Sequence, residues 1–252
     1  MRNLKVTIGY DGTNFQGWQE QRSGRTIEGE IRKGLFFMHK HPVNINAAGR
    51  TDSGVHATGQ VINYWSDLDS IPIERYCRAL NSFLPLDVRA RQVEEVDEAF
   101  HARHNARERS YKYYLYPADI PEPHLRIYSD RIVRRPNMNL LNEMAAVLIG
   151  THDFSSFSAP SEEVPNRVRT IYSACFHTEG PYLVFYIAGN GFLWRMVRSL
   201  VGSLLTYEAE GLHGSDVAEK LAAKNRKLAG PTAPAWGLFL HRVRYGNEQL
   251  LY

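Results

Sequence analysis

Residues 47–61 read AAGRTDSGVHATGQV, and they place one carboxylate, that of Asp52, between two segments with the composition of β-strands. These flanking segments, residues 43–48 and 55–65, predict two strands joined through the GRTDSG turn. An aspartate beside glycine in a tight turn often caps nearby amides, which is one interpretation of Asp52. Arg50 lies two residues earlier, and on an extended chain it would point to the same side as Asp52.

A second interpretation makes Asp52 a reactive group. If Arg50 pairs with Asp52, the Asp52 carboxylate would stay ionised even when that carboxylate is partly desolvated. Gly49 and Gly54 carry no side chains, so a ligand could approach closely. An ionised carboxylate of this kind can act as a nucleophile or a general base. Asp11, in the YDGTNF turn, is interpreted as structural, so the paired carboxylates of a glycosidase are not indicated.

Outward from this turn, the first part of the chain alternates strand and helix patterns. Residues 26–39 carry apolar side chains at helical spacing, with Thr26 as the expected N-cap. The other elements predicted here are a strand at 4–10, a helix at 72–82, and a loop followed by a strand within 84–96. The order is strand, helix, strand, strand, helix, strand, which is close to the ferredoxin-like arrangement.

The second part of the chain also mixes strands and helices. A polar connecting stretch at 98–106 separates the two parts, so we expect domains at residues 1–105 and 106–252, each with a largely antiparallel sheet. A loop of about 20 residues begins at Gly150, and loops of that length are often functional. The other predicted elements are strands at 110–117, 168–178, 182–189 and 238–245 and helices at 137–149, 191–207 and 215–223.

Composition is ordinary for a soluble globular protein, and it allows either contact with RNA or simply a solvated charged surface. Lysine and arginine total 30 residues, most of them arginine, and there are 14 tyrosines, a combination that suits contact with RNA. No apolar run spans a membrane and no signal peptide is visible, which predicts a cytoplasmic protein. His101 and His104 lack a third ligand, and His39 and His41 are expected on the surface. The two cysteines, Cys77 and Cys175, are expected to be buried and unpaired.

Several motifs, in one order along almost the whole chain, resemble those of the bacterial tRNA pseudouridine synthase A family. They are YDGTNFQGWQ, GRTDSGVHATGQV, NSFLPLDV, FHARHNARERSYKY, HDFSSFSA, VRTI, NGFLWRMVRSLVGSL and PAWGLFL. The resemblance implies an isomerase that converts uridine to pseudouridine at positions 38 to 40 of the tRNA anticodon stem-loop. It also implies a homodimer of α+β chains, each with two ferredoxin- or RRM-like domains joined across a central cleft, and no cofactor or metal.

The resemblance also implies roles for particular residues. Asp52 would be the catalytic residue, and Arg50 would contact the RNA or help to flip the base. Tyr111, at the start of the crossover strand, would stack on the extruded base, and Arg198 would pair with the catalytic carboxylate. Without the resemblance, Tyr111 could be a core tyrosine and Arg198 could extend to solvent.

The basic residues around the crossover predict a phosphate track. Those at the crossover are Arg103, Arg107, Arg109 and Lys112, and Arg22 and Arg25 on the first loop could add to the track. A solvated linker, partly neutralised by Glu108, is the alternative. Two other functions also remain open: a catalytically silent tRNA-binding or folding factor, and a glycoside- or nucleoside-hydrolysing enzyme.

Overall fold

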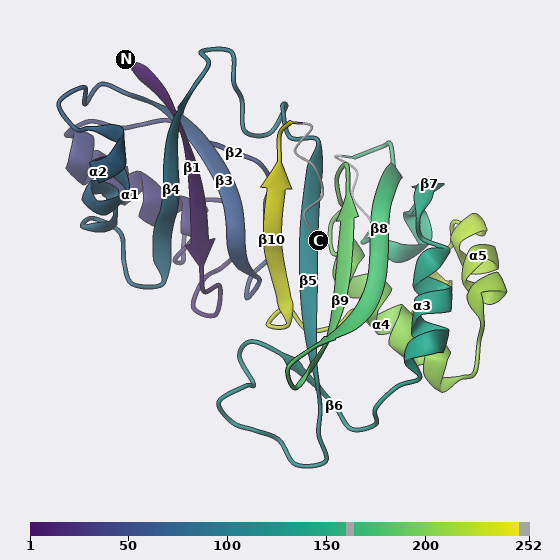
Figure 1. The fold of residues 1–252 in the computed structure, drawn as a ribbon. Helices are drawn as coiled ribbons and strands as arrows, with labels where there is room; N and C mark the ends of the chain where they lie inside the picture. The colour runs from purple at the N-terminus through teal and green to yellow at the C-terminus, as the bar shows by residue number, and fades with distance from the viewer. Residues whose placement is uncertain (160–163, 247–252) are drawn as a thin grey trace. The chain divides into compact units, whose positions relative to one another are not determined.

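A computed structural model describes residues 1–159 and 164–246 (Figure 1). Its contacts divide the chain into two units. Unit 1 is Met1–Arg107 together with the segment that begins at Phe239, and unit 2 is Glu108–Leu238. The crossing after Arg107 lies two residues from the predicted boundary. The return of the C-terminal strand to unit 1 differs from the prediction of two consecutive domains.

Unit 1 is a mostly antiparallel sheet with two helices. Its elements are β1 (Arg2–Tyr10), α1 (Ile27–His39), β2 (Asn46–Ala47), β3 (His56–Ser66), α2 (Ile73–Asn81), β4 (Val88–Val96) and β10 (Leu238–Arg244). β1 lies between β4 and β3 and is antiparallel to both. β3 pairs antiparallel with β2 and parallel with β10, where Phe239 is opposite His56. This pairing is why the C-terminal strand belongs to unit 1.

The sequence explains these elements directly. Thr26 caps α1, because its side chain accepts a hydrogen bond from the Gly29 N–H, and Ile27, Ile31 and Leu35 form the buried stripe. The helix ends at Lys40, which has a left-handed backbone with φ 66°. In β1 the fully buried Leu4, Val6 and Ile8 alternate with less buried residues, as expected for a strand with one face on the core.

Unit 2 has its own mostly antiparallel sheet, in the order β5-β9-β8-β7, and β6 pairs parallel with β5. α3 packs on β8, and α4 and α5 both contact α3. The elements are β5 (Glu108–Pro117), β6 (Asp130–Ile132), α3 (Met138–Ala146), β7 (Gly150–Asp153), β8 (Val168–Glu179), β9 (Tyr182–Gly189), α4 (Met196–Ala209) and α5 (Gly214–Ala222). The α+β class is confirmed.

Three predictions for unit 2 are wrong in detail. The helix predicted from residue 191 begins at Met196, because Arg195 has a left-handed backbone with φ 58° that no helix continues through. The predicted long loop contains β7 and a turn of 3₁₀ helix at Ser155–Phe157, and its residues 160–163 lie outside the described residues. The short strand β6 was missed. Within the described ranges, no helix combines the length and apolar character needed to cross a bilayer.

Candidate active site

Asp52 lies in the loop that connects β2 to β3, and main-chain hydrogen bonds hold this loop on both sides. The Trp18 N–H donates to the Thr51 carbonyl at 3.0 Å, and the Val55 N–H donates to the Asp52 carbonyl at 3.1 Å. The Asp52 side chain is half-buried, and its neighbours Thr51 and Val55 are buried. The carboxylate is therefore presented from a backbone that has little freedom to move.

The first loop of the chain, residues 11–25, packs directly against the Asp52 loop. The Tyr10 hydroxyl lies 2.8 Å from Oγ1 of Thr51. A Cβ atom at Gly12 would lie 2.1 Å from the Val55 carbonyl oxygen, so only glycine permits this approach of the two backbones. The turn chemistry recognised in the sequence at both loops thus forms one interlocked structure.

His56 supports the two interlocked loops, a role that was not predicted from the sequence. Its side chain is fully buried, and its Nδ1 accepts a hydrogen bond from the Gly12 N–H at 3.0 Å. Its ring stacks on Phe239 of β10 with centroids 4.6 Å apart. Asp11 accepts bonds from the N–H and hydroxyl of Thr13, which supports its interpretation as a turn residue.

Arg50 does not take the predicted place beside Asp52. The Arg50 side chain is exposed, and over residues 1–159 and 164–246 it forms no ion pair with Asp52. Within the described ranges, the pairing predicted between Arg50 and Asp52 is therefore not observed.

In unit 2, Tyr111 and Arg198 are positioned by separate elements. Tyr111 is on β5, opposite Ile187 of β9, and is 9% exposed. The edge of its ring meets Phe192, with centroids 5.0 Å apart. Arg198 is on α4 and half-buried, and its Nε donates to the Ala233 carbonyl at 2.7 Å.

A loop packed on α4 fixes the orientation of Arg198. The Ala233 N–H donates back to the Arg198 carbonyl at 3.0 Å, so the two residues are joined in both directions. A Cβ atom at Gly202 would lie 1.8 Å from the Pro231 carbonyl oxygen, so the helix needs glycine there for the loop to approach. Arg198 is thus a helix residue held by main-chain atoms of residues 231–233.

The buried Tyr113 hydroxyl makes polar contacts in the same part of unit 2 as Arg198. Its hydroxyl donates to the Pro234 carbonyl at 2.9 Å and is 3.4 Å from Oδ2 of Asp130. Burial, and then the negative charge of Asp130, raise the pKa of Tyr113, while the positive charge of Arg198 acts in the opposite direction. The tyrosine is therefore neutral at all physiological pH values and serves as a hydrogen-bond donor.

Two of the predicted RNA-binding residues are engaged in ion pairs inside their own unit. Arg25 contacts both carboxylate oxygens of Asp87, donates to Glu30, and lies over the Phe15 ring at 4.2 Å. Lys112 pairs with Glu179. Both residues therefore stabilise the fold.

The other predicted RNA-binding residues are more accessible. Arg22, Arg103 and Arg107 are exposed, and Arg109 donates to the Asn190 carbonyl at 3.0 Å. Arg103, Arg107 and Arg109 flank the point where the chain passes from unit 1 to unit 2. Their placement agrees with a basic stretch at the crossover.

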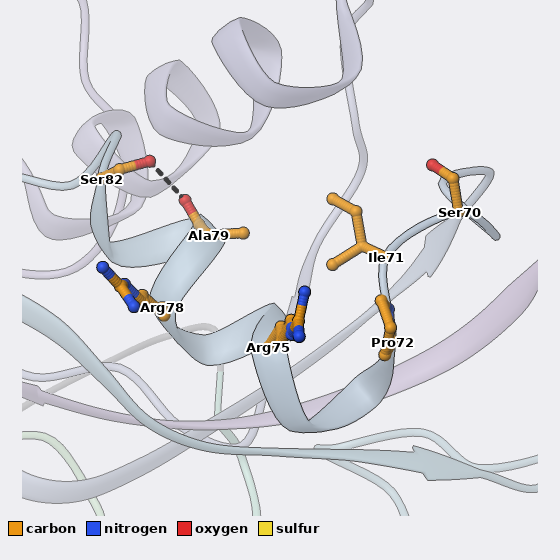
Figure 2. A pocket seen from close by; sticks show the side chains of 7 residues that line it. All are labelled: Ser70, Ile71, Pro72, Arg75, Arg78, Ala79 and Ser82. Atoms are coloured by element: carbon orange, nitrogen blue, oxygen red, sulfur yellow. Dashed lines mark hydrogen bonds between the residues drawn. The ribbon is translucent and has the colours of Figure 1, made fainter.

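A hollow along α2 is separate from these groups. Figure 2 shows its lining, which is Ser70, Ile71, Pro72, Arg75, Arg78, Ala79 and Ser82. Only the two arginines are charged, and the set has no carboxylate, histidine or thiol. This hollow includes none of the residues predicted to act in catalysis.

The chain matches a known family over most of its length. The family model for tRNA pseudouridine synthase matches residues 7–105 and 144–246. A protein of Treponema denticola named tRNA pseudouridine synthase A is 43% identical over 99% of this chain and 95% of its own length. The protein of the same name from Bacillus subtilis is 43% identical over 97% of this chain and 99% of its own length.

Structural similarity is weaker. A chain in the crystal structure of a Cbf5-Nop10-Gar1 complex aligns with 96% of this chain and 59% of its own length, with 11% identity and a TM-score of 0.36, too low to carry an argument. The sequence matches cover both units, including the Asp52 loop and α4. This chain therefore belongs to the tRNA pseudouridine synthase family.

Proposed function

We propose that this protein isomerises uridine to pseudouridine at positions 38 to 40 of the tRNA anticodon stem-loop, with Asp52 as the catalytic carboxylate. The observation that carries the proposal is the Asp52 loop. Main-chain bonds to Trp18 and within the loop hold a half-buried carboxylate in place, in a chain of this family. A backbone fixed in this way suits a group that must meet one atom of a bound nucleotide.

The reaction balances without a cosubstrate. The bond between N1 of the base and C1′ of the ribose breaks, the base turns, and a bond forms between C5 and C1′. The proton on C5 leaves and a proton is gained at N1, so the product is an isomer. Asp52 either adds to the base, adds to C1′, or removes the C2′ proton. Each route needs the base to leave the stack.

Tyr111 and Arg198 complete the proposed machinery. Tyr111 is a rigid aromatic group, buried against Phe192, and we assign it to stacking on the extruded base. Arg198 is the proposed charge partner of Asp52, because its guanidinium is a half-buried cation on an otherwise apolar helix face. Arg50, exposed beside the catalytic loop, is the proposed RNA contact.

The wider surface and assembly follow the same proposal. Arg22, Arg103, Arg107 and Arg109 would neutralise phosphates, while Arg25 and Lys112 would contribute less because each is already paired. Each unit is proposed to be a ferredoxin- or RRM-like domain, and the strand order β4-β1-β3-β2 supports this for unit 1. The working form is proposed to be a cytoplasmic homodimer that binds the anticodon stem-loop.

The test uses unmodified tRNA carrying tritium at C5 of uridine, since isomerisation releases that tritium. We expect release by the natural protein and a loss of roughly 10³-fold or more in Asp52→Asn. Binding of tRNA and the melting temperature should be unchanged in this variant. Asp119→Asn, at an exposed aspartate of unit 2, is the matched control and should keep full activity.

Other outcomes separate the alternatives. Binding of tRNA without tritium release by the natural protein would favour a silent binding or folding factor. Free uracil among the products would show a hydrolase. Release at more than a tenth of the natural rate by Asp52→Asn would remove Asp52 from the mechanism.

A further inference from the structure

Two histidines and an aspartate meet at one end of unit 1, outside the residues assigned to catalysis. His39 ends α1, His41 follows two residues later, and Asp67 follows directly after β3. Nδ1 of His39 is 2.6 Å from Oδ1 of Asp67, and Nε2 of His41 is 2.8 Å from Oδ2 of the same carboxylate. Each residue offers one ligand atom, and all three atoms lie within 4.8 Å of one another.

The prediction that both histidines lie on the surface is wrong for His39, because its side chain is fully buried. Its other ring nitrogen, Nε2, lies 3.2 Å from the Tyr76 hydroxyl, which lies 2.7 Å from Oγ of Ser66. Ser66 Oγ in turn accepts a hydrogen bond from the Leu68 N–H at 3.2 Å. The ring of His39 is therefore held in one orientation, as the histidine ligands of metal sites are by their outer partners.

This chain of hydrogen bonds engages Nε2 and leaves Nδ1 as the ring nitrogen that faces Asp67. Nδ1 of His39 lies 2.6 Å from Oδ1 of Asp67, so a nitrogen and a carboxylate oxygen that can both ligate a cation already face each other.

We propose that His39, His41 and Asp67 form a binding site for a divalent transition metal of the Zn²⁺ class. Two imidazoles and one carboxylate are the ligands that Zn²⁺, Co²⁺ and Ni²⁺ favour over Mg²⁺ and Ca²⁺. Tetrahedral coordination at about 2.0–2.1 Å separates ligand atoms by about 3.3 Å, so the two histidine–carboxylate contacts of 2.6 and 2.8 Å need to open by less than 1 Å. His41, 46% exposed, is free to make this adjustment, and water completes the coordination.

The charges around the site are compatible with a cation. Asp67 places a carboxylate between the two imidazoles, with Oδ1 2.6 Å from His39 and Oδ2 2.8 Å from His41. Arg2 is a partly buried cation in this region, with its guanidinium over the Tyr76 ring at 5.8 Å and its Nε 3.5 Å from Asp69. A bound metal would join the end of α1 to the end of β3, and would stabilise unit 1.

The experiment adds Zn²⁺ or Co²⁺ to the untagged full chain after treatment with a chelator. Calorimetry with Zn²⁺ should show one site per chain, and Co²⁺ should give visible absorption bands of a four-coordinate site. Zn²⁺ should also raise the melting temperature. His41→Asn and Asp67→Asn should each weaken binding roughly tenfold or more, and Tyr76→Phe should weaken it about tenfold through the orientation of His39.

The matched control is His104→Asn. His101 and His104 are the other close histidine pair, with ring centroids 4.2 Å apart, but no aspartate or glutamate of the described chain completes a three-ligand group with them. This variant should bind Zn²⁺ as the natural protein does. Absence of Zn²⁺ binding by the natural protein would overturn the proposal, and so would equal binding by His41→Asn and Asp67→Asn. In both cases the cluster is held by protons alone.

Discussion

The Asp52 loop and the Arg198 helix present their charged groups in different ways. In unit 1 the backbone carrying Asp52 is held by other backbone, at Trp18 and along the first loop. In unit 2 the Arg198 side chain extends from a regular helix, and a carbonyl of the neighbouring loop orients it. A substitution that disturbs these contacts in unit 1 is therefore expected to move the whole Asp52 loop. A substitution in unit 2 is expected to release only the Arg198 side chain from the Ala233 carbonyl.

The largest expected effect on stability is at Gly12. In Gly12→Ala the new Cβ would overlap the Val55 carbonyl, which is the last residue before β3 and cannot shift alone. We expect the free energy of unfolding to fall by about 3 kcal/mol and tritium release to be lost. Urea denaturation measures the first and the tRNA assay the second. Gly49→Ala, with no atom within 4 Å of its new Cβ, should leave stability unchanged. Equal stability of the two variants would contradict the interlocked loops.

Gly202→Ala tests the corresponding contact in unit 2. Alanine favours helix over glycine by about 1 kcal/mol, so propensity alone predicts stabilisation. The overlap with the Pro231 carbonyl should reverse this and give a loss of about 2 kcal/mol, less than at Gly12 because a loop can move. Activity should fall as Ala233 moves away from Arg198. Gly191→Ala, whose Cβ would meet only the Arg169 side chain at 3.7 Å, is the control. Stabilisation of Gly202→Ala would show that the loop is not in close contact.

Glu208 gives a smaller effect with a pH signature. Its carboxylate, 4% exposed on α4, accepts a bond from the Asn137 N–H at 2.8 Å and pairs with Arg134. Burial acts to raise the pKa of Glu208, but the bonds from Arg134 and Asn137 outweigh it, and the pKa is lowered. Because the folded pKa is lowered, this stabilisation is present above the unfolded pKa of about 4.5 and is lost as pH falls through the folded value.

We therefore expect Glu208→Gln to cost about 1–2 kcal/mol at pH 7. The difference from the natural protein should shrink below pH ~4.5. Urea denaturation at several pH values measures it, with the exposed Glu210→Gln as control. A difference that stays constant down to the acid limit would show that the charge of Glu208 is not involved.

The smallest effect separates two arginines, Arg50 in the Asp52 loop and Arg25 in the first loop. Arg50→Ala should weaken tRNA binding and reduce the slope of log affinity against log salt by about 1, since one phosphate contact is removed. Arg25→Ala should leave that slope unchanged and lower stability by less than about 1 kcal/mol, because its ion pairs are partly exposed. Binding assays at several salt concentrations measure both. An unchanged slope for Arg50→Ala and a smaller slope for Arg25→Ala would assign the RNA contact to Arg25.

Local patterns in the sequence explain the elements that were predicted well. Helical spacing of apolar residues and the Thr26 cap identify α1 almost to the residue, and alternation identifies β1, β8 and β9. These signals are local, because the spacing of apolar residues within each element determines which face of that element is buried. The GRTDSG turn was recognised for the same reason.

The errors concern what local patterns do not contain. The parallel pairing of β10 with β3 joins residues far apart in sequence, and so does the meeting of His39 with Asp67. Arg50 was predicted from strand alternation to pair with Asp52, but its side chain is exposed and this ion pair is not formed within the described ranges. The left-handed Arg195 shortened α4 although its residues have helical spacing. For the candidate site, the sequence predicted residues whose roles remain proposals, and it did not predict their structural supports, such as His56 and Ala233.

The place of β10 has a consequence for synthesis of the protein on the ribosome. The ring of His56, next to the Asp52 loop, stacks on Phe239 of β10. Unit 1 therefore lacks this strand and this part of its core until residues 239–244 have emerged. Domains generally fold as they leave the ribosome, N-terminal part first. Here the N-terminal part of unit 1 is synthesised first, but its sheet is completed only after all of unit 2 has been synthesised. Nascent chains that end before residue 239 would lack the ring that stacks on His56, the buried side chain next to the Asp52 loop.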